Sequence, residues 1–509
     1  MQVTSSRLVE TLERLWPAAA ALPPPASEVL RLCTDSRQAG PGSLFVAVPG
    51  VTADGRDFIA SALAAGADAV LCHVGDRRDC PRDPRVVALP DLRERLGELG
   101  RELFAVPDSL ELIGVTGTNG KSSVTHYIAA LSQALGIEAG LVGTLGHGRP
   151  GALHDGGLTT PGPLALQAAL AELAEAGVRR VAMEVSSHAL EQGRLDGCRL
   201  SAAVFTNLTR DHLDYHGSMA AYAAAKAKLF RRGELRLAVV NADDPLARLM
   251  LAGLRDGVRV LAAGQDEAVT FRVVDRHPHA AGQRALVATP EGERVLETSL
   301  LGGFNLDNVL LAMTTLYGLG HDIGELFDAA AGLAPVPGRM EALVRPGAPS
   351  VVIDYAHTPD ALDNALAALR DHLPVDGQLW CLFGCGGDRD PGKRSLMAAA
   401  AARHADRLVV TDDNPRSEAP ATIRAQVLDG LTSTARAKAL EIDGRSEAIA
   451  RVLAEADAED VVLIAGKGHE TYQEIAGVRY PFSDLAEAER ALAARRGGSG
   501  NGDAGEGLS

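Results

Sequence analysis

The clearest chemical signal in the sequence is a glycine-rich segment that follows an apolar run. Residues 112–115 read as a buried strand, and the sequence Gly-Thr-Asn-Gly-Lys-Ser-Ser at 117–123 leads into a helical stretch. Glycines let backbone N–H groups approach phosphate oxygens, the helix N-terminus favours negative charge, and Lys121 can reach the β- and γ-phosphates. Ser122 would place its hydroxyl on Mg²⁺. We predict a nucleoside triphosphate site rather than a turn that only connects strand to helix, made by Gly117, Thr118, Asn119, Gly120, Lys121, Ser122 and Ser123.

A carboxylate and an imidazole stand at the ends of two later strand-like runs. Glu184 lies at the end of the run 181–185, and His212 follows the run 202–206. In open parallel sheets, chemistry collects at the carboxyl ends of the strands. Such a pair can hold Mg²⁺ against triphosphate oxygens, which lowers the repulsion toward an incoming nucleophile. We predict a magnesium site of Ser122, Glu184 and His212; the alternatives are a surface acid and a helix cap.

Three loops in the last third of the chain carry side chains suited to a doubly charged amino acid. A substrate with two carboxylates and two ammonium groups needs guanidinium forks for the former and carboxylates for the latter. Arg389 and Arg416 could supply the forks, and Asp413 and Glu470 could hold an ammonium group. The alternative, a turn with one solvated arginine, explains one loop but not three. The predicted set is Arg389, Asp413, Asn414, Pro415, Arg416, Gly466 and Glu470.

The elements that must position these side chains read as an α/β protein of three domains. Continuous apolar runs separated by Ala-rich helical stretches are typical of parallel sheets covered on both faces. We expect a P-loop-type parallel sheet in the central domain, a Rossmann-like C-terminal domain and a smaller N-terminal α/β domain. The predicted boundaries are residues 1–106, 107–337 and 338–495, with a disordered tail over 496–509. The strand-like runs are 44–48, 69–73, 86–89, 112–115, 181–185, 202–206, 237–241, 351–355, 379–383, 408–411 and 461–465.

Bulk composition excludes several classes of protein. The 509 residues carry a formal net charge of −16, so the chain has no global basic footprint for nucleic acid. It shows neither the apolar N-terminal stretch of a signal peptide nor a run of about 18 apolar residues that could span a membrane. The six cysteines lack a zinc-like pairing and are expected to be reduced. We therefore expect a cytoplasmic protein without nucleic-acid or membrane partners.

Five segments together resemble the Mur ligase family of cell-wall synthesis. They are Gly-Thr-Asn-Gly-Lys-Ser-Ser (117–123), Glu-Val-Ser-Ser-His (184–188), Thr-Asn-Leu-Thr-Arg-Asp-His-Leu-Asp-Tyr-His-Gly (206–217), Gly-Phe-Asn-Leu-Asp-Asn (303–308) and Asp-Tyr-Ala-His-Thr-Pro (354–359). They stand in the family's order and extend over all three expected domains. In addition, Asp-Asn-Pro-Arg at 413–416 resembles the form found in members that add meso-diaminopimelate.

The resemblance implies roles for the residues that match the family's motifs. Lys121 and its loop would bind ATP, with Asn305 and Asn308 on the adenine side. Arg339 and Asp354 would reach the nucleotide from the C-terminal domain. Thr-Asp-Ser-Arg at 34–37 resembles the motif that holds the uridine part. The expected contacts to the UDP-muramoyl-dipeptide are Ser36, Thr159, Thr160, Ser186, Gln192 and Arg194.

Lys226 resembles the family lysine that CO₂ converts to a carbamate, N6-carboxylysine. A neutral, desolvated amine that reacts in this way becomes an anion, which turns a cation into a further magnesium ligand or orienter. The alternative is a surface lysine on a helix, as Lys228 nearby reads. The resemblance thus implies Lys121, Lys226 and His212 as catalytic residues, with Mg²⁺, ATP and a CO₂-derived carbamate on Lys226.

The resemblance further implies an ATP-dependent amide ligase of peptidoglycan precursor synthesis. It would add meso-diaminopimelate to the D-glutamate γ-carboxylate of UDP-N-acetylmuramoyl-L-alanyl-D-glutamate through an acyl phosphate, and we expect a monomer. Two alternatives stay open. A ligase of the same superfamily that adds L-lysine, or glutamate to folate, is disfavoured by residues 34–37 and 413–416. A nucleotide-gated ATPase that makes no amide would need no amino-acid loops.

Overall fold

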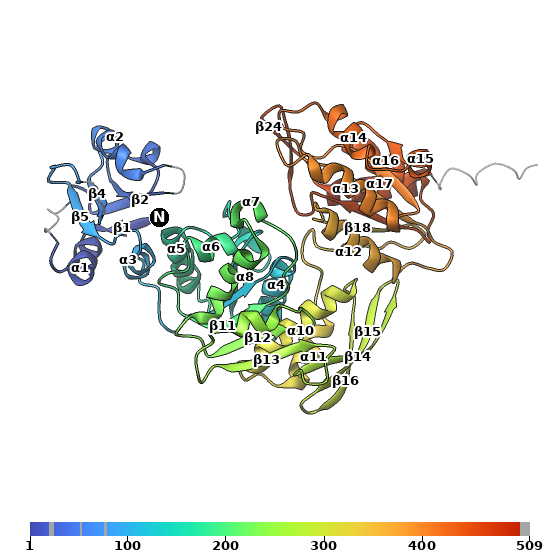
Figure 1. Ribbon diagram of the computed structural model, residues 1–509, viewed down its shortest axis with the longest axis horizontal. Coiled ribbons are helices and arrows are strands. Elements are labelled where there is room, and N and C mark those ends of the chain that lie inside the picture. The colour runs from blue at the N-terminus through green and yellow to red at the C-terminus, as the bar shows by residue number, and fades with distance from the viewer. Residues whose placement is uncertain (20–24, 51–52, 76–78, 499–509) are drawn as a thin grey trace, which may run out of the picture. The chain divides into compact units, whose positions relative to one another are not determined.

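The computed structural model describes residues 1–19, 25–50, 53–75 and 79–498 of the chain (Figure 1). The chain folds as an α/β protein of three domains, and its tertiary contacts group it into two compact units. One unit comprises Met1–Ala262 with Thr314–Gly320, and the other comprises Ala263–Met313 with the chain from His321 onward. Among the described residues, none of the helices combines the length and the apolar character needed to cross a bilayer.

The first domain is a five-stranded sheet with helices on both faces. Its elements are β1 (Gln2–Thr4), α1 (Ser5–Leu15), β2 (Val29–Cys33), η1 (Ser36–Gln38), β3 (Ser43–Ala47), η2 (Gly55–Phe58), α2 (Ile59–Ala64), β4 (Ala69–Val74), β5 (Val86–Pro90) and α3 (Leu96–Leu103). The strand order is β1-β2-β3-β4-β5, and only the β1–β2 pair is antiparallel. All of β3 is buried because α1 and α3 pack on one face and α2 on the other. This double coverage explains why the strands read as continuous apolar runs.

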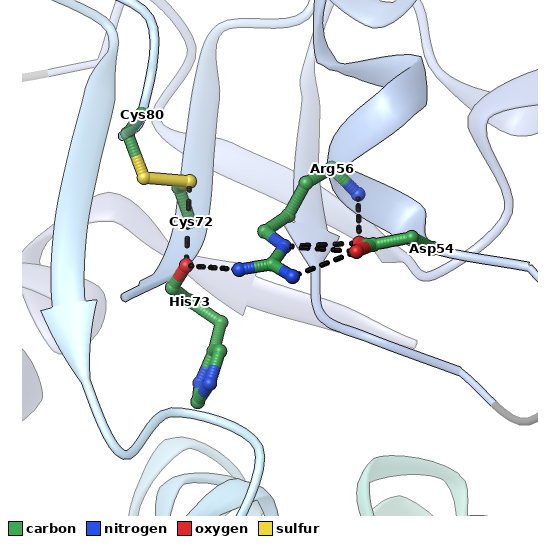
Figure 2. The surroundings of a disulfide bond; sticks show 5 residues. All are labelled: Asp54, Arg56, Cys72, His73 and Cys80. Atoms are coloured by element: carbon green, nitrogen blue, oxygen red, sulfur yellow. Dashed lines mark hydrogen bonds and ion pairs between the residues drawn. A yellow bond between two sulfur atoms is a disulfide. The ribbon is translucent and has the colours of Figure 1, made fainter. Parts of the chain in front are cut away.

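A disulfide joins Cys72 of β4 to Cys80 in this domain (Figure 2). The two Cα atoms are 6.2 Å apart, which is a normal disulfide separation. The expectation of six reduced cysteines is therefore wrong for this pair, because Cys80, eight residues further on, lies beside the strand. The free cysteines among the described residues, all of them buried, are Cys33, Cys198, Cys381 and Cys385.

The central domain is built on parallel strands, so their carboxyl ends all lie at the same end of the sheet. Its elements are β6 (Glu111–Thr116), α4 (Lys121–Ala134), β7 (Ala139–Gly143), β8 (Gly146–Arg149), β9 (Ala152–His154), α5 (Pro163–Glu175), β10 (Arg180–Glu184), α6 (Ser187–Glu191), β11 (Leu200–Phe205), α7 (Leu213–His216), α8 (Met219–Ala227), η3 (Lys228–Arg231), β12 (Leu237–Asn241), α9 (Ala247–Leu251) and β13 (Arg259–Gly264). In the first unit the order is β12-β11-β6-β10-β7-β8-β9. The strands from β12 to β7 are parallel, so the residues that follow β6, β10 and β11 are neighbours.

Three antiparallel strands then interrupt the alternation of strands and helices that the sequence predicts. They are β14 (Phe271–His279), β15 (Gly282–Thr289) and β16 (Gly292–Thr298), and they precede α10 (Gly303–Gly318) and α11 (Ile323–Ala331). The expectation is wrong here because these strands are partly exposed and carry no continuous apolar run; most residues of β16 are exposed. The buried Gln283 side chain ties β15 to the start of α10 by donating to the carbonyls of Leu300 and Gly302, both at 2.9 Å.

The C-terminal domain is a mostly parallel sheet between two helical layers. Its elements are β17 (Glu341–Leu343), β18 (Ser350–Asp354), α12 (Pro359–Arg370), β19 (Leu379–Phe383), α13 (Gly392–His404), β20 (Arg407–Val410), α14 (Pro420–Leu428), α15 (Ser433–Arg436), β21 (Leu440–Glu441), α16 (Arg445–Glu455), β22 (Val461–Ala465), β23 (Tyr472–Ile475), β24 (Val478–Pro481) and α17 (Asp484–Gly498). The strand order is β17-β18-β22-β19-β20-β21, and only β17 is antiparallel to its neighbour. Helices α12, α13 and α14 pack on one face, and α16 and α17 on the other.

The end of α17 differs from the predicted boundary of the tail. The helix continues to Gly498, whereas the sequence places the start of a disordered tail at residue 496. Arginines follow the Ala-rich stretch there, and arginine is among the residues that favour a helix most after alanine. The rest of the predicted tail, residues 499–509, lies outside the described residues.

Candidate active site

The glycine-rich segment forms a turn between β6 and α4 that needs glycine at two positions. Gly117 has φ 155° and Gly120 has φ 81°, values that side-chain-bearing residues rarely adopt. A Cβ atom added to Gly117 would collide with the hydroxyl oxygen of Thr206, so the turn passes directly beside the end of β11. Helix α4 begins at Lys121, and the N–H groups of its first turn have no intrahelical acceptor. This backbone arrangement favours an anion.

The segment after β11 holds the turn in place. The backbone N–H of Thr118 donates to the carbonyl of Asn207 at 2.8 Å, and the N–H of Asn119 donates to the Asn207 side-chain oxygen at 3.0 Å. In return, the N–H of Thr209 donates to Thr118 Oγ1 at 3.0 Å. The predicted phosphate loop is therefore held in place without a ligand. The residues that hold it, Asn207 and Thr209, follow the end of β11.

Two lysine ammonium groups meet at the carbonyl oxygen of Gly117. Lys121 Nζ donates to it at 3.0 Å, and Lys226 Nζ donates at 2.7 Å. Lys226 on α8 is 1% exposed and lies over the ring of Tyr222, so the alternative of a surface lysine is wrong. Lys228, whose side chain is 46% exposed, fits that description instead. Burial, reinforced by the charge of Lys121, lowers the pKa of Lys226 well below its usual value.

Glu184 ends β10 as a buried carboxylate. The residue is 1% exposed, which excludes an ordinary surface acid. Its Oε1 accepts from the backbone N–H of Thr144 at 2.9 Å, and its Oε2 accepts from the Thr144 hydroxyl at 3.0 Å. These two contacts orient the carboxylate, while each oxygen keeps a further lone pair for a ligand.

His212 precedes α7 in a left-handed backbone conformation with φ 51°, which is uncommon for a residue with a side chain. Its side chain makes no capping hydrogen bond to α7, so the helix-cap alternative is wrong. The imidazole packs edge-on against His188, with ring centroids 4.9 Å apart. Because His188 stands four residues after Glu184, this contact draws the loop after β11 toward the end of β10.

Residues predicted to contact the muramoyl-dipeptide form a cluster around the end of β10. Thr160 Oγ1 donates to the carbonyl of Glu184 at 2.9 Å and accepts from the N–H of Ser186 at 3.1 Å. Thr159 Oγ1 lies 3.1 Å from the hydroxyl oxygen of Thr144, which itself contacts the Glu184 carboxylate.

Arg194 and Gln192 extend this cluster. Arg194 donates from Nη1 to the carbonyl of Thr160 at 2.8 Å and from Nη2 to Gln192 Oε1 at 2.7 Å. The Gln192 amide donates to the hydroxyl of Tyr215 at 3.3 Å. Ser36 stands apart in η1 of the first domain, and no hydrogen bond between described residues joins it to the cluster. Five of the six predicted contacts are thus brought together.

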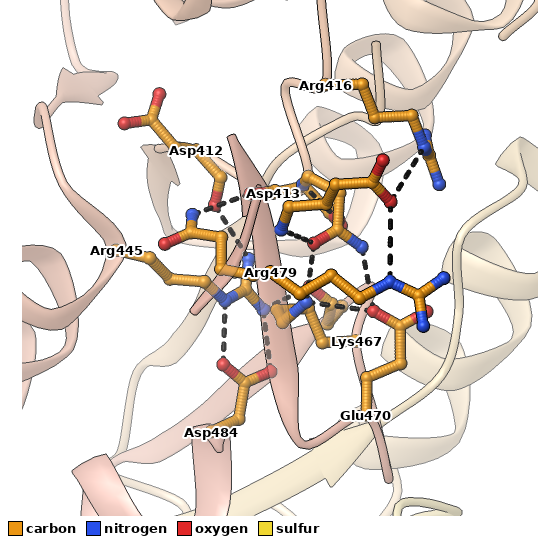
Figure 3. A network of polar contacts seen from close by, with 12 residues as sticks. Asp412, Asp413, Arg416, Arg445, Lys467, Glu470, Arg479 and Asp484 are labelled. Carbon is orange, nitrogen blue, oxygen red and sulfur yellow. Dashed lines mark hydrogen bonds and ion pairs between the residues drawn. The ribbon is translucent and has the colours of Figure 1, made fainter. Parts of the chain in front are cut away.

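In the second unit, the loops after β20 and β22 meet through polar side chains (Figure 3). The Asn414 amide donates to Glu470 Oε2 at 2.8 Å, and the Asn414 backbone N–H donates to Asp413 Oδ1 at 2.6 Å. Gly466 has φ 114°, and a Cβ atom added to it would lie 2.8 Å from Asp413 Oδ2. Glycine at this position therefore allows the two loops to approach, and four predicted residues converge.

Arg416 and Arg389 both pass close to Gly386, in the loop after β19, but Arg389 is exposed. A Cβ atom added to Gly386 would lie 2.9 Å from Arg416 Nη1 and 3.7 Å from Arg389 Cγ. Arg416 has φ 50°, its N–H donates to the carbonyl of Glu474 at 3.0 Å, and its side chain is 20% exposed. It is therefore a fixed and mostly covered guanidinium rather than a solvated charge, and Pro415 before it is buried.

The four predicted ATP contacts outside the glycine-rich segment all belong to the second unit. Asn305 and Asn308 lie on α10 and are 2% and 6% exposed. Asp354 ends β18, and its carboxylate accepts two backbone N–H groups, each at 2.8 Å. Burial raises the pKa of this carboxyl group. The Arg339 guanidinium lies over the ring of Tyr355, 4.4 Å from its centroid.

Several residues in these contacts were not singled out from the sequence. Most follow a strand end by one to four positions, which is the signal that could have identified them; Tyr215 and Glu474 carry no such signal. They are Thr144, Asn207, Thr209, Tyr215, Lys467 and Glu474.

A hollow of about 750 Å³ lies at the amino-terminal ends of the strands of the central sheet. Its lining includes Glu111, Arg180 and Leu200, which begin β6, β10 and β11. The predicted residues stand at the opposite, carboxyl ends of these strands. The hollow is therefore not part of the candidate site.

Three family profiles match the chain in succession. The profile of the Mur ligase family catalytic domain matches residues 28–102, and that of the Mur ligase middle domain matches residues 115–316. The profile of the Mur ligase glutamate ligase domain matches residues 338–468.

Individual proteins match over nearly the whole length. The chain is 50% identical over 468 residues to the UDP-N-acetylmuramoyl-L-alanyl-D-glutamate--2,6-diaminopimelate ligase of Pseudomonas aeruginosa, with 92% of this chain and 95% of that protein covered. A solved structure of a ligase with the same name superposes with a TM-score of 0.70 at 38% identity, over 97% of this chain and 100% of that chain. The MurF ligase of Thermotoga maritima, solved in complex with ADP, shares the fold with a TM-score of 0.62 at 19% identity, over 92% and 98% of the two chains. The chain described here belongs to the Mur ligase family.

Proposed function

We propose that this Mur ligase uses ATP to join meso-diaminopimelate to UDP-N-acetylmuramoyl-L-alanyl-D-glutamate in peptidoglycan precursor synthesis. The proposal is carried by the mostly covered guanidinium of Arg416, together with the contact of Asn414 with Glu470 that joins the loops after β20 and β22. A second carboxylate distinguishes meso-diaminopimelate from lysine, and a guanidinium such as that of Arg416 could bind this carboxylate, whereas lysine has none to offer. The name of the P. aeruginosa relative supports the same reaction.

ATP would place its phosphates on residues 117–123. The β- and γ-phosphates would meet the N-terminal turn of α4 and Lys121, which already lies at the turn through its contact with Gly117. Asn305, Asn308, Arg339 and Asp354 would hold the remainder of the nucleotide.

Ser122, Glu184 and His212 would hold Mg²⁺. The hydroxyl and the oriented carboxylate are the oxygen donors that this ion prefers, and the described residues contain no group of three or more His, Cys, Asp or Glu that could hold a metal on their own. Phosphate oxygens of ATP would be further oxygen donors for the ion. Bound there, Mg²⁺ would neutralise charge on the triphosphate.

Carbamylation of Lys226 would resolve the crowding of two cations at Gly117. The lowered pKa of Lys226 supplies the neutral amine that attacks CO₂, forming an N–C bond and releasing one proton. The product is an anion buried close to Lys121, where a cation stood before. It would orient Lys121 and the metal.

The reaction begins when the D-glutamate γ-carboxylate attacks the γ-phosphorus of ATP. The γ-phosphoryl group passes to the carboxylate oxygen and ADP leaves, which gives an acyl phosphate. The uncharged amine of meso-diaminopimelate then attacks the acyl carbon, an amide bond forms, and phosphate leaves. Lys121 would stabilise the transferring phosphoryl group, and the cluster of Thr159, Thr160, Ser186, Gln192 and Arg194 would position the acceptor. Ser36 would hold the uridine end.

One chain supplies every group that this scheme requires. We therefore infer that the enzyme acts as a monomer, in the cytoplasm where ATP is available. Sedimentation of the purified protein tests the first point: a mass near 53.1 kDa is expected, and a dimer would contradict it.

Identification of the product by mass spectrometry tests the proposed reaction. The enzyme is incubated with ATP, Mg²⁺ and the UDP-muramoyl-dipeptide, together with meso-diaminopimelate, L-lysine or no amino acid. We expect one new amide only with meso-diaminopimelate. An equally abundant lysine product would remove the proposed specificity, and ATP hydrolysis without any amide would favour an ATPase.

A further inference from the structure

Lys467, in the loop after β22, is a charged residue with no exposed surface (Figure 3). Its ammonium group donates to Glu470 Oε2 at 2.8 Å and to Asn414 Oδ1 at 3.1 Å. A buried cation is costly unless it is paired and hydrogen-bonded. Both of its partners belong to the set proposed to contact the amino acid, although Lys467 itself is too deeply buried to reach a ligand.

The contact with Lys467 helps to set the orientation of the Asn414 amide. Oδ1 accepts from Lys467 Nζ and also from the backbone N–H of Glu474, at 2.9 Å. The amide nitrogen therefore faces Glu470, to which it donates at 2.8 Å. Rotation of the amide by half a turn would place its N–H₂ group against two donors and would lose both bonds.

The same ammonium group fixes the carboxylate of Glu470. Lys467 and Asn414 both donate to Oε2, and among the described residues no hydrogen bond is made to Oε1. The side chain of Glu470 is 20% exposed, so it reaches the surface of the loop. Oε1 is thus the oxygen placed to accept from an ammonium group.

A second buried ion pair holds the strand ends from which these loops begin. Arg445 contacts both oxygens of Asp484 at 2.7 Å, with the two side chains fully buried. It also donates to the carbonyl of Ala465 at 2.8 Å and to that of Asp412 at 3.2 Å, at the ends of β22 and β20. Lys467 and Asn414 are therefore carried by strand ends that cannot shift independently.

We propose that Lys467 is a positioning residue that presents Glu470, directly and through the Asn414 amide, to the ammonium group of the incoming amino acid. The inference rests on the proposed function of this site. An apolar side chain of similar length would fill the same space without the cost of burying a charge. The charge of Lys467 instead orients the carboxylate of Glu470 and the amide of Asn414.

The test compares steady-state kinetics of Lys467→Met with those of Lys438→Met, an exposed lysine of the same domain. We expect Lys467→Met to raise the KM for meso-diaminopimelate at least about tenfold, since a hydrogen bond to a charged group is lost. The kcat and the KM for ATP should stay within about twofold of wild type, as in Lys438→Met. An unchanged KM for the amino acid, or an equal loss in all parameters, would overturn the proposal.

A double variant separates positioning from general stability. If Lys467 acts through Glu470, Lys467→Met combined with Glu470→Gln should have the same KM for the amino acid as Glu470→Gln alone. A further rise of about threefold or more in the double variant would contradict the proposal. Because the double variant buries no unpaired charge, it also serves if Lys467→Met alone does not fold.

The wild-type enzyme distinguishes this inference from the proposed function. If it uses an amino acid other than meso-diaminopimelate, the proposed specificity fails and the same variants are compared with the amino acid that it does use. If no amino acid stimulates ADP release, the proposed function and this inference fall together.

Discussion

The ammonium groups of Lys121 and Lys226 donate to one and the same acceptor, the carbonyl oxygen of Gly117, at 3.0 and 2.7 Å. Two cations at one oxygen repel each other, and Lys226 has almost no solvent to screen its charge. Loss of the Lys226 proton removes the repulsion, and conversion to a carbamate replaces it with attraction. The chemistry proposed for Lys226 is thus favoured by its neighbour.

We expect Lys226 to carry a carbamate whose occupancy rises with pH. Only the neutral amine reacts with CO₂, and because the pKa is lowered in the folded protein, the neutral form persists to lower pH than for a free lysine. Incubation with ¹³C-bicarbonate should give a carbamate resonance in the NMR spectrum, lost in Lys226→Met and retained in Lys228→Met. Ligase activity should fall at least about 100-fold in the former variant only. A spectrum without this resonance at pH 8 would contradict the assignment.

Substitution of Gly117 by alanine should weaken ATP binding at least about tenfold, because the new methyl group and the positive φ both oppose the native turn. Gly332→Ala is the matched control: its added Cβ atom would meet only ordinary van der Waals contact. Titration with a fluorescent ATP analogue measures the difference. Equal affinities of the two variants would show that the turn does not hold the phosphates.

Removal of the Arg416 guanidinium should raise the KM for meso-diaminopimelate about 10- to 150-fold, the effect of losing about 1.5–3 kcal/mol of charged hydrogen bonding. Discrimination against L-lysine should shrink by the same factor, since lysine lacks the carboxylate in question. Arg451→Ala, at an exposed position of α16, serves as the control. If Arg416→Ala kept the wild-type preference for meso-diaminopimelate over L-lysine, the side-chain carboxylate of meso-diaminopimelate would have to be bound by another residue.

His372 should make the protein less stable as the pH falls. Its Nε2 accepts from the N–H of Gly302 at 2.9 Å, a role that only the neutral ring can fill, and burial lowers the pKa of the ring. Below about pH 6.5 the unfolded chain takes up a proton that the folded state resists, so stability is lost as pH falls through this window. The thermal midpoint should therefore fall less between pH 7.5 and 5 in His372→Gln than in wild type or in the exposed control His277→Gln. Parallel pH profiles in all three proteins would count against this account.

The parallel strands could be predicted from the sequence because strands buried on both faces form continuous apolar runs. The runs 181–185 and 461–465 correspond to β10 (Arg180–Glu184) and β22 (Val461–Ala465) within one residue. The side chains predicted from strand ends follow from this, because parallel topology brings such ends together. Glu184 and Asp413 were located in this way.

Other features depend on partners far apart in the chain and leave no local pattern. β14 (Phe271–His279) contains Pro278 and alternates only partly, so it reads as a loop. Lys467, between two glycines, looks like a surface lysine until Asn414 and Glu470 are seen around it. The pairing of Cys72 with Cys80 is likewise invisible in their spacing.

The most direct test of the central claim is ADP release by the wild-type enzyme under four conditions: complete mixture, without the UDP-muramoyl-dipeptide, without amino acid, and with L-lysine in place of meso-diaminopimelate. We predict sustained ADP release only in the complete mixture. Release at the same rate without either acceptor, or with L-lysine as with meso-diaminopimelate, would contradict it.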